Sequence, residues 1–323
     1  MSWPTFPMSK FSTSIHTISG DEGLGKFHAL AYRLFNWANN QLPVRYLDAN
    51  LGLLEFRPRS LRANWPRLDR GSSPARRLSQ LFLLELPWSK IEGELGEIQV
   101  VDIGCGSGYY GVRLTEYSHR RLATYTGIDI RQRETWQSLE EQYPNFRLHL
   151  LTSDNLLDCL PEGANFFLTS SALEHFREDL LPFLQLRDYI SSYGRSVLQV
   201  HLLPSSANLS HSPYHGVRQY TPRTVSKLTR LFSGSSHSVL FGLGSKQCNR
   251  VHYEFITAPL FRYGLGDLRE SQAEIYEEAL LSAVEEDMRS PGYPPACYAL
   301  IILSNWKTEL FLPDSARTVG QRT

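Results

Sequence analysis

Apolar runs and segments with helix-spaced apolar residues alternate through the middle of this chain. The short runs, rich in Val, Ile, Leu and aromatic residues, predict buried strands, and the segments between them predict helices. The predicted strands are 97–103, 123–130, 146–151, 164–170 and 195–202. The predicted helices are 109–118, 133–142, 174–192 and 222–232. This alternation indicates βαβ units, and therefore an α/β fold with a doubly wound, mostly parallel sheet.

The N-terminal part has a different pattern. Residues 1–20 are rich in Ser, Thr and Pro and are expected to be poorly ordered. Residues 21–94 form an N-terminal extension that is helical and rich in Arg, with helices predicted over 24–41 and 75–86. The apolar residues that predict the first of these helices are Phe27, Leu30, Leu34 and Trp37.

The pattern changes again after the fifth strand. A polar, Ser-rich loop of roughly 18 residues spans 204–222, and long ordered loops in compact domains are commonly functional. The later β-prone segments are 237–243, 250–257 and 298–304. An acidic helix precedes the last of them, with Ile275, Leu280 and Val284 facing inward. Residues 306–323 are expected to be a loose tail.

Composition and charge exclude several classes of protein. The 33 basic and 33 acidic side chains cancel, so no global field favours nucleic acid or an anionic membrane. Four scattered cysteines show no disulfide framework and no metal-ligand spacing, so no metal is expected. No signal peptide or apolar run of membrane-spanning length is seen, which favours a cytoplasmic location.

The most informative motif follows the first strand of the alternating block. Asp102 is followed by Gly104, Gly106 and Gly108, alternating with single residues, at a predicted strand–turn–helix junction. Glycines are needed where a chain turns with positive φ or brings bare backbone against a ligand. Open α/β sheets bind nucleotides at such junctions, beyond the carboxyl ends of their strands.

Two kinds of nucleotide are compatible with this turn. The stretch from Gly106 to Gly111 also fits the G-x-G-x-x-G pattern of pyrophosphate-binding folds. Asp102 favours the other kind, because a carboxylate just before the turn repels a pyrophosphate and suits a ligand with an ammonium or sulfonium group.

The motif resembles the Asp/Glu-x-Gly-x-Gly-x-Gly sequence of the class I S-adenosylmethionine (SAM)-dependent methyltransferases and fits it at every fixed position. The resemblance is strong over 95–202 and weak elsewhere. It implies a seven-stranded sheet ending in an antiparallel hairpin, and SAM as the methyl donor. On this basis residues 95–305 form the SAM-binding domain, with acceptor-side insertions at 204–222 and 243–250.

The resemblance also implies roles for further residues. Asp129, 21 residues after Gly108, would bind the ribose hydroxyls, with Ile130 against the adenine. A nicotinamide-binding fold also expects an acid near this position, so Asp129 alone does not discriminate. After the third strand, Asp154 would bond the adenine amino group and Leu156 would pack on the ring. The same stretch also fits a simple Asx turn.

The fourth strand ends in a segment that contains Ser171, Glu174 and His175 and resembles the Leu-Glu-His stretch of small-molecule methyltransferases. Ser171 is expected to line the donor pocket, and His175 is a candidate base. Glu174 and His175 also fit ordinary helix-start positions.

His201, at the end of the fifth strand, is a second candidate base, because a neutral imidazole can take a proton from a hydroxyl. It also fits the alternative of a hydrogen-bonded core histidine. Further acceptor-side candidates are His215, Tyr220, Asn249 and His252.

An arginine-rich segment from Arg57 to Arg77 holds seven arginines against one acid, Asp69. It fits either a solvated loop or a binding surface for a phosphate or carboxylate on the acceptor.

The sequence therefore predicts a SAM-dependent methyltransferase that modifies a hydroxyl oxygen of a small-molecule or glycan-type acceptor. No Asn-Pro-Pro-Tyr-like motif follows the fourth strand, which argues against methylation of nucleic-acid amino groups. The alternatives are an NAD(P)-dependent oxidoreductase and a non-catalytic SAM-binding module.

Overall fold

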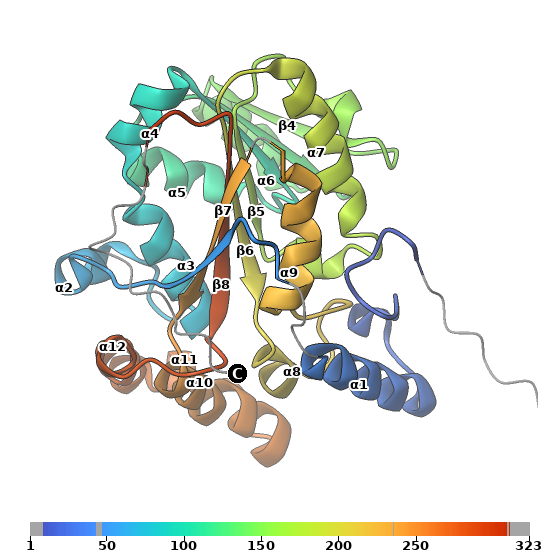
Figure 1. Ribbon diagram of the computed structural model, residues 1–323. Helices are drawn as coiled ribbons and strands as arrows, with labels where there is room; N and C mark the ends of the chain where they lie inside the picture. The colour runs from blue at the N-terminus through green and yellow to red at the C-terminus, as the bar shows by residue number, and fades with distance from the viewer. Residues whose placement is uncertain (1–8, 43–46, 235, 309, 311–323) are drawn as a thin grey trace, which may run out of the picture.

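The computed structural model describes residues 9–42, 47–234, 236–308 and 310. Its centre is one twisted sheet, seen edge-on in Figure 1. The eight strands of this part of the chain are β1 (Leu51–Glu55), β2 (Ile98–Ile103), β3 (Leu122–Asp129), β4 (Phe146–Leu150), β5 (Phe166–Ser170), β6 (Val197–Pro204), β7 (Ser236–Leu243) and β8 (Cys297–Ser304).

The strand order is β1-β7-β8-β6-β5-β2-β3-β4. All paired strands are parallel except β8, which runs antiparallel between β6 and β7. The order reverses between β2 and β5, so the sheet is doubly wound as the sequence predicts. The expected closing hairpin is also present, because β7 and β8 pair in an antiparallel way.

The predicted seven strands are one too few. Residues Leu51–Glu55 form an eighth, which extends the sheet by pairing in parallel with β7. Its five residues are partly exposed along most of their length, since it is an edge strand. Such a short segment carries no apolar run or alternation that separates it from a loop.

Helices cover both faces of the sheet (Figure 1). Those on one face are α3 (Pro74–Leu84), α4 (Trp88–Leu95) and α5 (Tyr109–Tyr117), which pack through residues such as Leu81 and Leu114. Those on the other face are α7 (Leu180–Tyr193) and α9 (Pro222–Thr229), which pack through Phe183 and Leu228. The helix α6 (Thr135–Gln142) connects β3 to β4.

A further group of helices lies at the end of the sheet where β6 ends, at the bottom of Figure 1. They are α1 (Lys26–Gln41), α8 (Asn208–His211), α10 (Lys246–His252), α11 (Leu268–Ser271) and α12 (Ala273–Arg289). A π-helix, Tyr253–Tyr263, continues α10. The remaining short elements are Gly20–Glu22, α2 (Leu61–Asn64), Trp65–Arg67, Leu156–Cys159, Leu173–His175 and Arg230–Phe232.

The strand predicted over 250–257 is wrong, because this segment is helical. Its buried apolar residues are Val251, Phe255 and Ile256. The second and third lie four and five positions after the first, so all three share one helical face. Short apolar runs fit either period, and here packing against the core selects the helix. In α12, Leu280 and Val284 are buried as predicted, whereas Ile275 is 61% exposed.

The helix predicted over 24–41 is present as α1, but the apolar residues that predict it point outward. Phe27, Leu30, Leu34 and Trp37 are 51–59% exposed. The buried side instead carries Tyr32, whose hydroxyl donates to the carbonyl of His215 at 3.0 Å. Ala31 and Tyr32 also pack with Ile18, so contacts with distant segments decide which side of this helix faces the protein.

The expected disorder over 1–20 is wrong for residues 9–20, while residues 1–8 lie outside the described part. The backbone N–H and hydroxyl of Thr13 both donate to the buried Asp179 carboxylate, at 2.8 and 2.5 Å. Thr13 thus helps Arg218 to satisfy the buried charge of Asp179. At the other end, Lys307 donates to Glu94 and Leu310 is buried, and 309 and 311–323 lie outside the described residues.

Candidate active site

The candidate site lies where the strand order reverses, between β2 and β5. The glycine turn, residues 104–108, follows β2, and the segment from Ser171 to His175 follows β5. The two segments touch, because a Cβ built on Gly104 would lie 2.4 Å from the Cβ of Ala172. The structure therefore brings together two motifs that are more than 60 residues apart in the chain, at the point where open sheets bind ligands.

All three glycines of the turn adopt left-handed backbone, with φ of 79°, 55° and 80° for Gly104, Gly106 and Gly108. Their surroundings differ. A Cβ on Gly108 would meet Leu139 at 2.7 Å, whereas a Cβ on Gly106 would have nothing within 4 Å. Gly104 and Gly108 thus allow close packing, and Gly106 leaves open space above bare backbone, which is the kind of surface a ligand needs.

The N–H groups of the turn are directed into the protein. Those of Gly104 and Cys105 donate to the carbonyl of Ile128, at 2.7 and 3.1 Å. The N–H of Gly106 donates to Oδ2 of Asp129 at 2.9 Å. A pyrophosphate site needs such groups free for phosphate oxygens. This arrangement disfavours a dinucleotide at the turn.

Asp102 occupies the end of β2 below the turn and is 1% exposed. The hydroxyl of Tyr125 donates to its Oδ2 at 2.8 Å, and its Oδ1 has no partner. Burial raises the pKa of Asp102 to about 7, against the Tyr125 hydrogen bond and with a further contribution from the Asp129 charge. A cationic ligand would supply the partner that this carboxylate lacks.

Asp129 ends β3 beside the turn. Its Oδ1 accepts from the N–H of Arg131, and its Oδ2 accepts from Gly106. A carboxylate has about four acceptor positions, so both oxygens can still accept from ribose hydroxyls. Ile130 is 67% exposed next to it, as contact with a ligand ring requires. The predicted pair thus borders the turn on an accessible side.

The two residues expected near the adenine have different positions. Asp154 is exposed in the loop after β4, and its carbonyl accepts from Gln185. Leu156 is 2% exposed and packs with the core under α7, so its side chain has almost no surface for a ring. The loop is closed by hydrogen bonds among Ser153, Asn155 and Asp158, as in the alternative turn interpretation.

Ser171, expected to line the pocket, is exposed and has a φ of 49°. A positive φ is uncommon for a residue other than glycine, so the backbone at Ser171 is held in this conformation by its surroundings. Its N–H donates to the carbonyl of Leu202, which fixes the turn after β5. The next residue, Ala172, is the one that touches Gly104.

His201 has the contacts of a core histidine rather than a base. It is 0% exposed, with Nδ1 3.0 Å from Oγ1 of Thr169 and Nε2 3.3 Å from Oε1 of Gln199. Burial lowers its pKa to about 3. Because β6 is an interior strand with helices on both faces, the side chain has no route to an acceptor, and the catalytic prediction for His201 is not supported.

His175 and His215 come together, although they are 40 residues apart in the chain. Their ring centroids are 4.7 Å apart. Two carboxylates join them: Oδ2 of Asp21 is 2.7 Å from Nδ1 of His175, and Oε1 of Glu174 is 3.8 Å from Nε2 of His215. These four residues are hereafter the histidine–carboxylate cluster, and two of them, Glu174 and His175, follow Ser171 within four residues.

The other acceptor-side candidates are engaged elsewhere. Tyr220 is buried, and its hydroxyl donates to Asp179. The side-chain amide of Asn249 donates to the carbonyl of Pro294. His252 stacks on His211, and burial lowers its pKa to about 3.

Several residues of the site have no signal in the sequence. The indole N–H of Trp136 donates to the carbonyl of Gly106, and the Thr135 hydroxyl donates to that of Ser107, so α6 holds the turn from outside. Tyr125 and Asp21 likewise lie in no sequence motif that identifies them as residues of the site. Only the strand register and the path of the N-terminal segment bring them to Asp102 and His175.

Three of the seven arginines of the arginine-rich segment pair with the acidic helix. Arginine–glutamate pairs join the segment to α12, with N–O distances of 2.6–2.8 Å: Arg62–Glu285, Arg70–Glu274 and Arg77–Glu277. The two charge runs of the sequence therefore compensate each other in part. For Arg62, Arg70 and Arg77 this finding favours a structural role over an acceptor-binding one.

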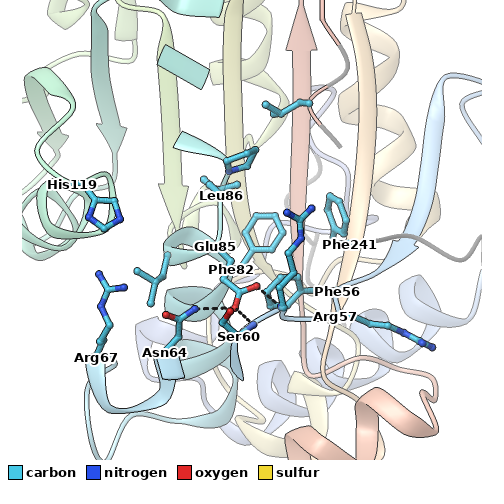
Figure 2. A pocket seen from close by; sticks show the side chains of 14 residues that line it. Phe56, Arg57, Ser60, Asn64, Arg67, Phe82, Glu85, Leu86, His119 and Phe241 are labelled. Carbon is cyan, nitrogen blue, oxygen red and sulfur yellow. Dashed lines mark hydrogen bonds between the residues drawn. The ribbon is translucent and has the colours of Figure 1, made fainter. Parts of the chain in front are cut away.

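A separate pocket with a volume of about 370 Å³ lies beside this segment (Figure 2). Arg57, Arg67, Glu85 and His119 are among its lining residues, and Glu85 accepts from Asn64 and from the N–H of Ser60. His119 precedes the start of β3, whereas the glycine turn follows the end of the parallel strand β2. The pocket is thus at the opposite end of these strands from the candidate site.

No helix in the described part of the chain has the length and apolar character of a membrane span.

Comparisons with known proteins find structural matches only. No family model and no curated protein matches the sequence. A SAM-dependent methyltransferase from Archaeoglobus fulgidus is 18% identical, with 67% of this chain and 90% of that chain covered and a TM-score of 0.40. The 1,6-didemethyltoxoflavin-N1-methyltransferase of Burkholderia thailandensis, solved with S-adenosylhomocysteine (SAH), is 15% identical, with 70% and 79% covered and a TM-score of 0.36.

The plantazolicin methyltransferase BpumL, solved with SAH, is 12% identical over 76% of this chain and 90% of its own, with a TM-score of 0.38. At these values the matches do not identify an activity or a ligand for this chain. The sheet itself is more informative, because it is doubly wound and ends in the antiparallel hairpin that the resemblance implies. The chain therefore has the fold of the class I methyltransferases.

Proposed function

We propose that this protein is a SAM-dependent methyltransferase. The observation that carries the proposal is Asp102, a buried carboxylate with one unpartnered oxygen at the end of β2. When bound, SAM would supply a methyl group activated by a sulfonium. The residues present fit SAM. The buried carboxylate of Asp102 lacks a cationic partner, Gly106 leaves open space above its backbone, and Asp129 retains acceptor positions for ribose hydroxyls.

The acceptor is proposed to be a hydroxyl of a small molecule or glycan, and the location to be cytoplasmic. A hydroxyl must lose its proton on methylation, and the histidine–carboxylate cluster is where a proton acceptor is available. Within it, Oδ2 of Asp21 lies 2.7 Å from Nδ1 of His175 and fixes the orientation of the ring. For the transfer itself the protein mainly needs to position the two reactants.

The alternative of an NAD(P)-dependent oxidoreductase is disfavoured by the same site, because the carboxyl group of Asp102 lies next to the turn and the N–H groups of Gly104 and Gly106 already donate within the protein. Differential scanning fluorimetry with SAH, NAD and NADP separates the two functions. Of the three ligands, only SAH should raise the melting temperature of the protein, by an amount that grows with SAH concentration. Stabilisation by NAD or NADP without SAH would refute the proposal.

A second measurement separates an enzyme from a binding module. The protein is incubated with SAM labelled in the methyl group and with panels of phenols, sugars and nucleotide-sugars, and SAH release is followed. An enzyme releases SAH with at least one acceptor class, and the label moves to the acceptor. A module that binds SAH but transfers no label to any panel would support the non-catalytic alternative.

A further inference from the structure

We infer that the histidine–carboxylate cluster binds one divalent cation of the zinc type, through Glu174, His175 and His215. One potential ligand atom from each of these residues lies within 4.8 Å of the others. Imidazole and carboxylate together suit first-row ions such as Zn²⁺ or Co²⁺, whereas Mg²⁺ prefers oxygen ligands alone.

The cluster is assembled from three separate parts of the chain. Asp21 comes from the N-terminal segment, Glu174 and His175 follow β5, and His215 lies in the loop before α9. Backbone hydrogen bonds hold these parts close together: Gly20 donates to the carbonyl of Gly216 at 2.7 Å, and Val217 donates to that of Glu174 at 2.6 Å.

Glycines make this close approach possible. A Cβ on Gly20 would lie 2.6 Å from the backbone of Tyr214, and one on Gly216 would lie 2.7 Å from the carbonyl oxygen of Glu174. Gly216 also has a φ of 66°. The three segments can therefore meet only with bare backbone at both positions, and the meeting brings the four side chains to one place.

The strongest indication of a ligand is Glu174. Its side chain is 1% exposed, and its Oε2 is buried without a hydrogen-bond partner. A buried carboxylate without a full set of partners is costly. The nearest cationic candidate, Nε2 of His215, is 3.8 Å from Oε1, which is beyond hydrogen-bond length. A cation between the two would satisfy both groups.

Asp21 is placed to orient the ring of His175 and lies beside that of His215. Its Oδ2 is 2.7 Å from Nδ1 of His175, and its Oδ1 is 3.9 Å from Nδ1 of His215. A carboxylate on Nδ1 leaves Nε2 as the ligand atom, as second-shell carboxylates do at zinc sites. In the same arrangement the carboxylate also accepts from the N–H of Gly216, at 3.0 Å, so its own position is fixed.

Ligand atoms of a tetrahedral site are about 3.3 Å apart at zinc–ligand distances near 2.0–2.1 Å. The three atoms must therefore approach by up to about 1.5 Å. The side chains of His175 and His215 are 36% and 42% exposed, so both can adjust by rotation. The same exposure leaves coordination positions for water or for an oxygen of the acceptor. In this role His175 is a ligand rather than a free base.

The test uses the full-length protein after treatment with a chelator. Zinc uptake is measured by mass spectrometry of the metal and by calorimetry, and Co²⁺ reports on coordination through its visible absorption. We expect one Zn²⁺ per chain, stabilisation against heat by Zn²⁺ and not by Mg²⁺, and a Co²⁺ spectrum of low coordination number. The variants His215→Asn and Glu174→Gln should each weaken zinc binding on the order of 100-fold, and Asp21→Asn about 10- to 100-fold.

The matched control is His119→Asn, which removes an exposed histidine far from the cluster. Its φ of 56° is one that Asn tolerates, and its zinc binding should equal that of the parent. Absence of zinc uptake by the parent would show that protons alone neutralise the cluster, and would overturn the inference. Equal uptake by the parent and by all three cluster variants would overturn it as well.

Two features keep the test decisive. If Glu174→Gln does not fold, His215→Asn and Asp21→Asn alter side chains that are 42% and 39% exposed and still give the answer. SAH binding, measured in the same preparations without metal, reports on the proposed donor site independently. Failure of the cation site therefore leaves the proposed function standing, and the reverse holds too.

Discussion

The hydroxyl of Tyr125 donates a 2.8 Å hydrogen bond to Oδ2 of Asp102, and Oδ1 of the same carboxylate has no partner. A tyrosine of β3 thus holds one oxygen of the Asp102 carboxylate in place, and the other oxygen remains able to accept from a ligand. Because the acid is 1% exposed, its charge is costly until a cation arrives. Four of the predictions that follow depend on this pair or on the glycine turn.

Replacing Asp102 with Asn should stabilise the ligand-free protein at pH 8. Burial raises the pKa of Asp102 from 3.8 to about 7. Its favourable contribution is therefore full below about pH 4 and is lost as the pH rises through 7, by up to about 4 kcal/mol. Melting temperatures of parent and Asp102→Asn should converge near pH 4 and separate by pH 8. The exposed change Asp188→Asn is the control and should show no such divergence.

SAH binding should strengthen as the pH rises from 5.5 to 7 and then level off. The ligand's ammonium group needs the ionised form of Asp102, so affinity should change by up to about tenfold per pH unit below the pKa. Calorimetry across this range measures the slope. Asp102→Asn should bind about 100-fold more weakly and lose the slope associated with this group. An unchanged slope in the variant would assign the titration to another group.

Replacing Tyr125 with Phe should move the midpoint of that pH profile upward. The Tyr125 hydrogen bond favours the ionised form of Asp102 and holds its pKa down. Without it, Asp102 ionises at higher pH, and SAH affinity at pH 7 should fall while affinity at pH 8.5 stays closer to that of the parent. A uniform loss at every pH would instead indicate a change in packing alone.

The glycines of the turn should respond differently to alanine. A Cβ on Gly106 has nothing within 4 Å, so Gly106→Ala should fold with a loss of about 1–2 kcal/mol for left-handed backbone. Its added methyl group would stand in the open space of the site and weaken SAH binding at least tenfold. Gly104→Ala would place its Cβ 2.4 Å from that of Ala172 and should be far less stable. Chemical denaturation and calorimetry distinguish the two effects.

The arginine–glutamate pairs should differ in their contribution to stability. Arg77 is 1% exposed, lies over the Trp65 ring and pairs with Glu277, so Arg77→Met should cost about 3–5 kcal/mol by leaving that carboxylate unpaired. Arg70 is 63% exposed, so water screens its pair with Glu274, and Arg70→Gln should change stability much less than Arg77→Met. Urea unfolding measures both. Neither Arg70→Gln nor Arg62→Gln should change the KM of an identified acceptor.

Local sequence determines the central part of the fold, because its strands, its helices and the glycine turn each depend on residues that are close together in the chain. The apolar strands, the three glycines after Asp102 and the acid at 129 follow from residue type and spacing, and the structure places them at one site. The same reasoning fails where two patterns are equally compatible with the residues. Residues 250–257 form a helix, and Phe27, Leu30, Leu34 and Trp37 face outward, because contacts with distant segments outweigh local preference.

Only the tertiary structure decides which polar groups meet. His201 ends one predicted strand and His175 follows another, yet His201 is enclosed between sheet and helix while His175 is joined by Asp21, Glu174 and His215. Asp21 is more than 150 residues from His175, and no spacing rule connects them. The chain's local order sets the turn that can receive a nucleotide-like ligand. The charges that surround it depend on long-range packing, which determines how far each one is removed from water.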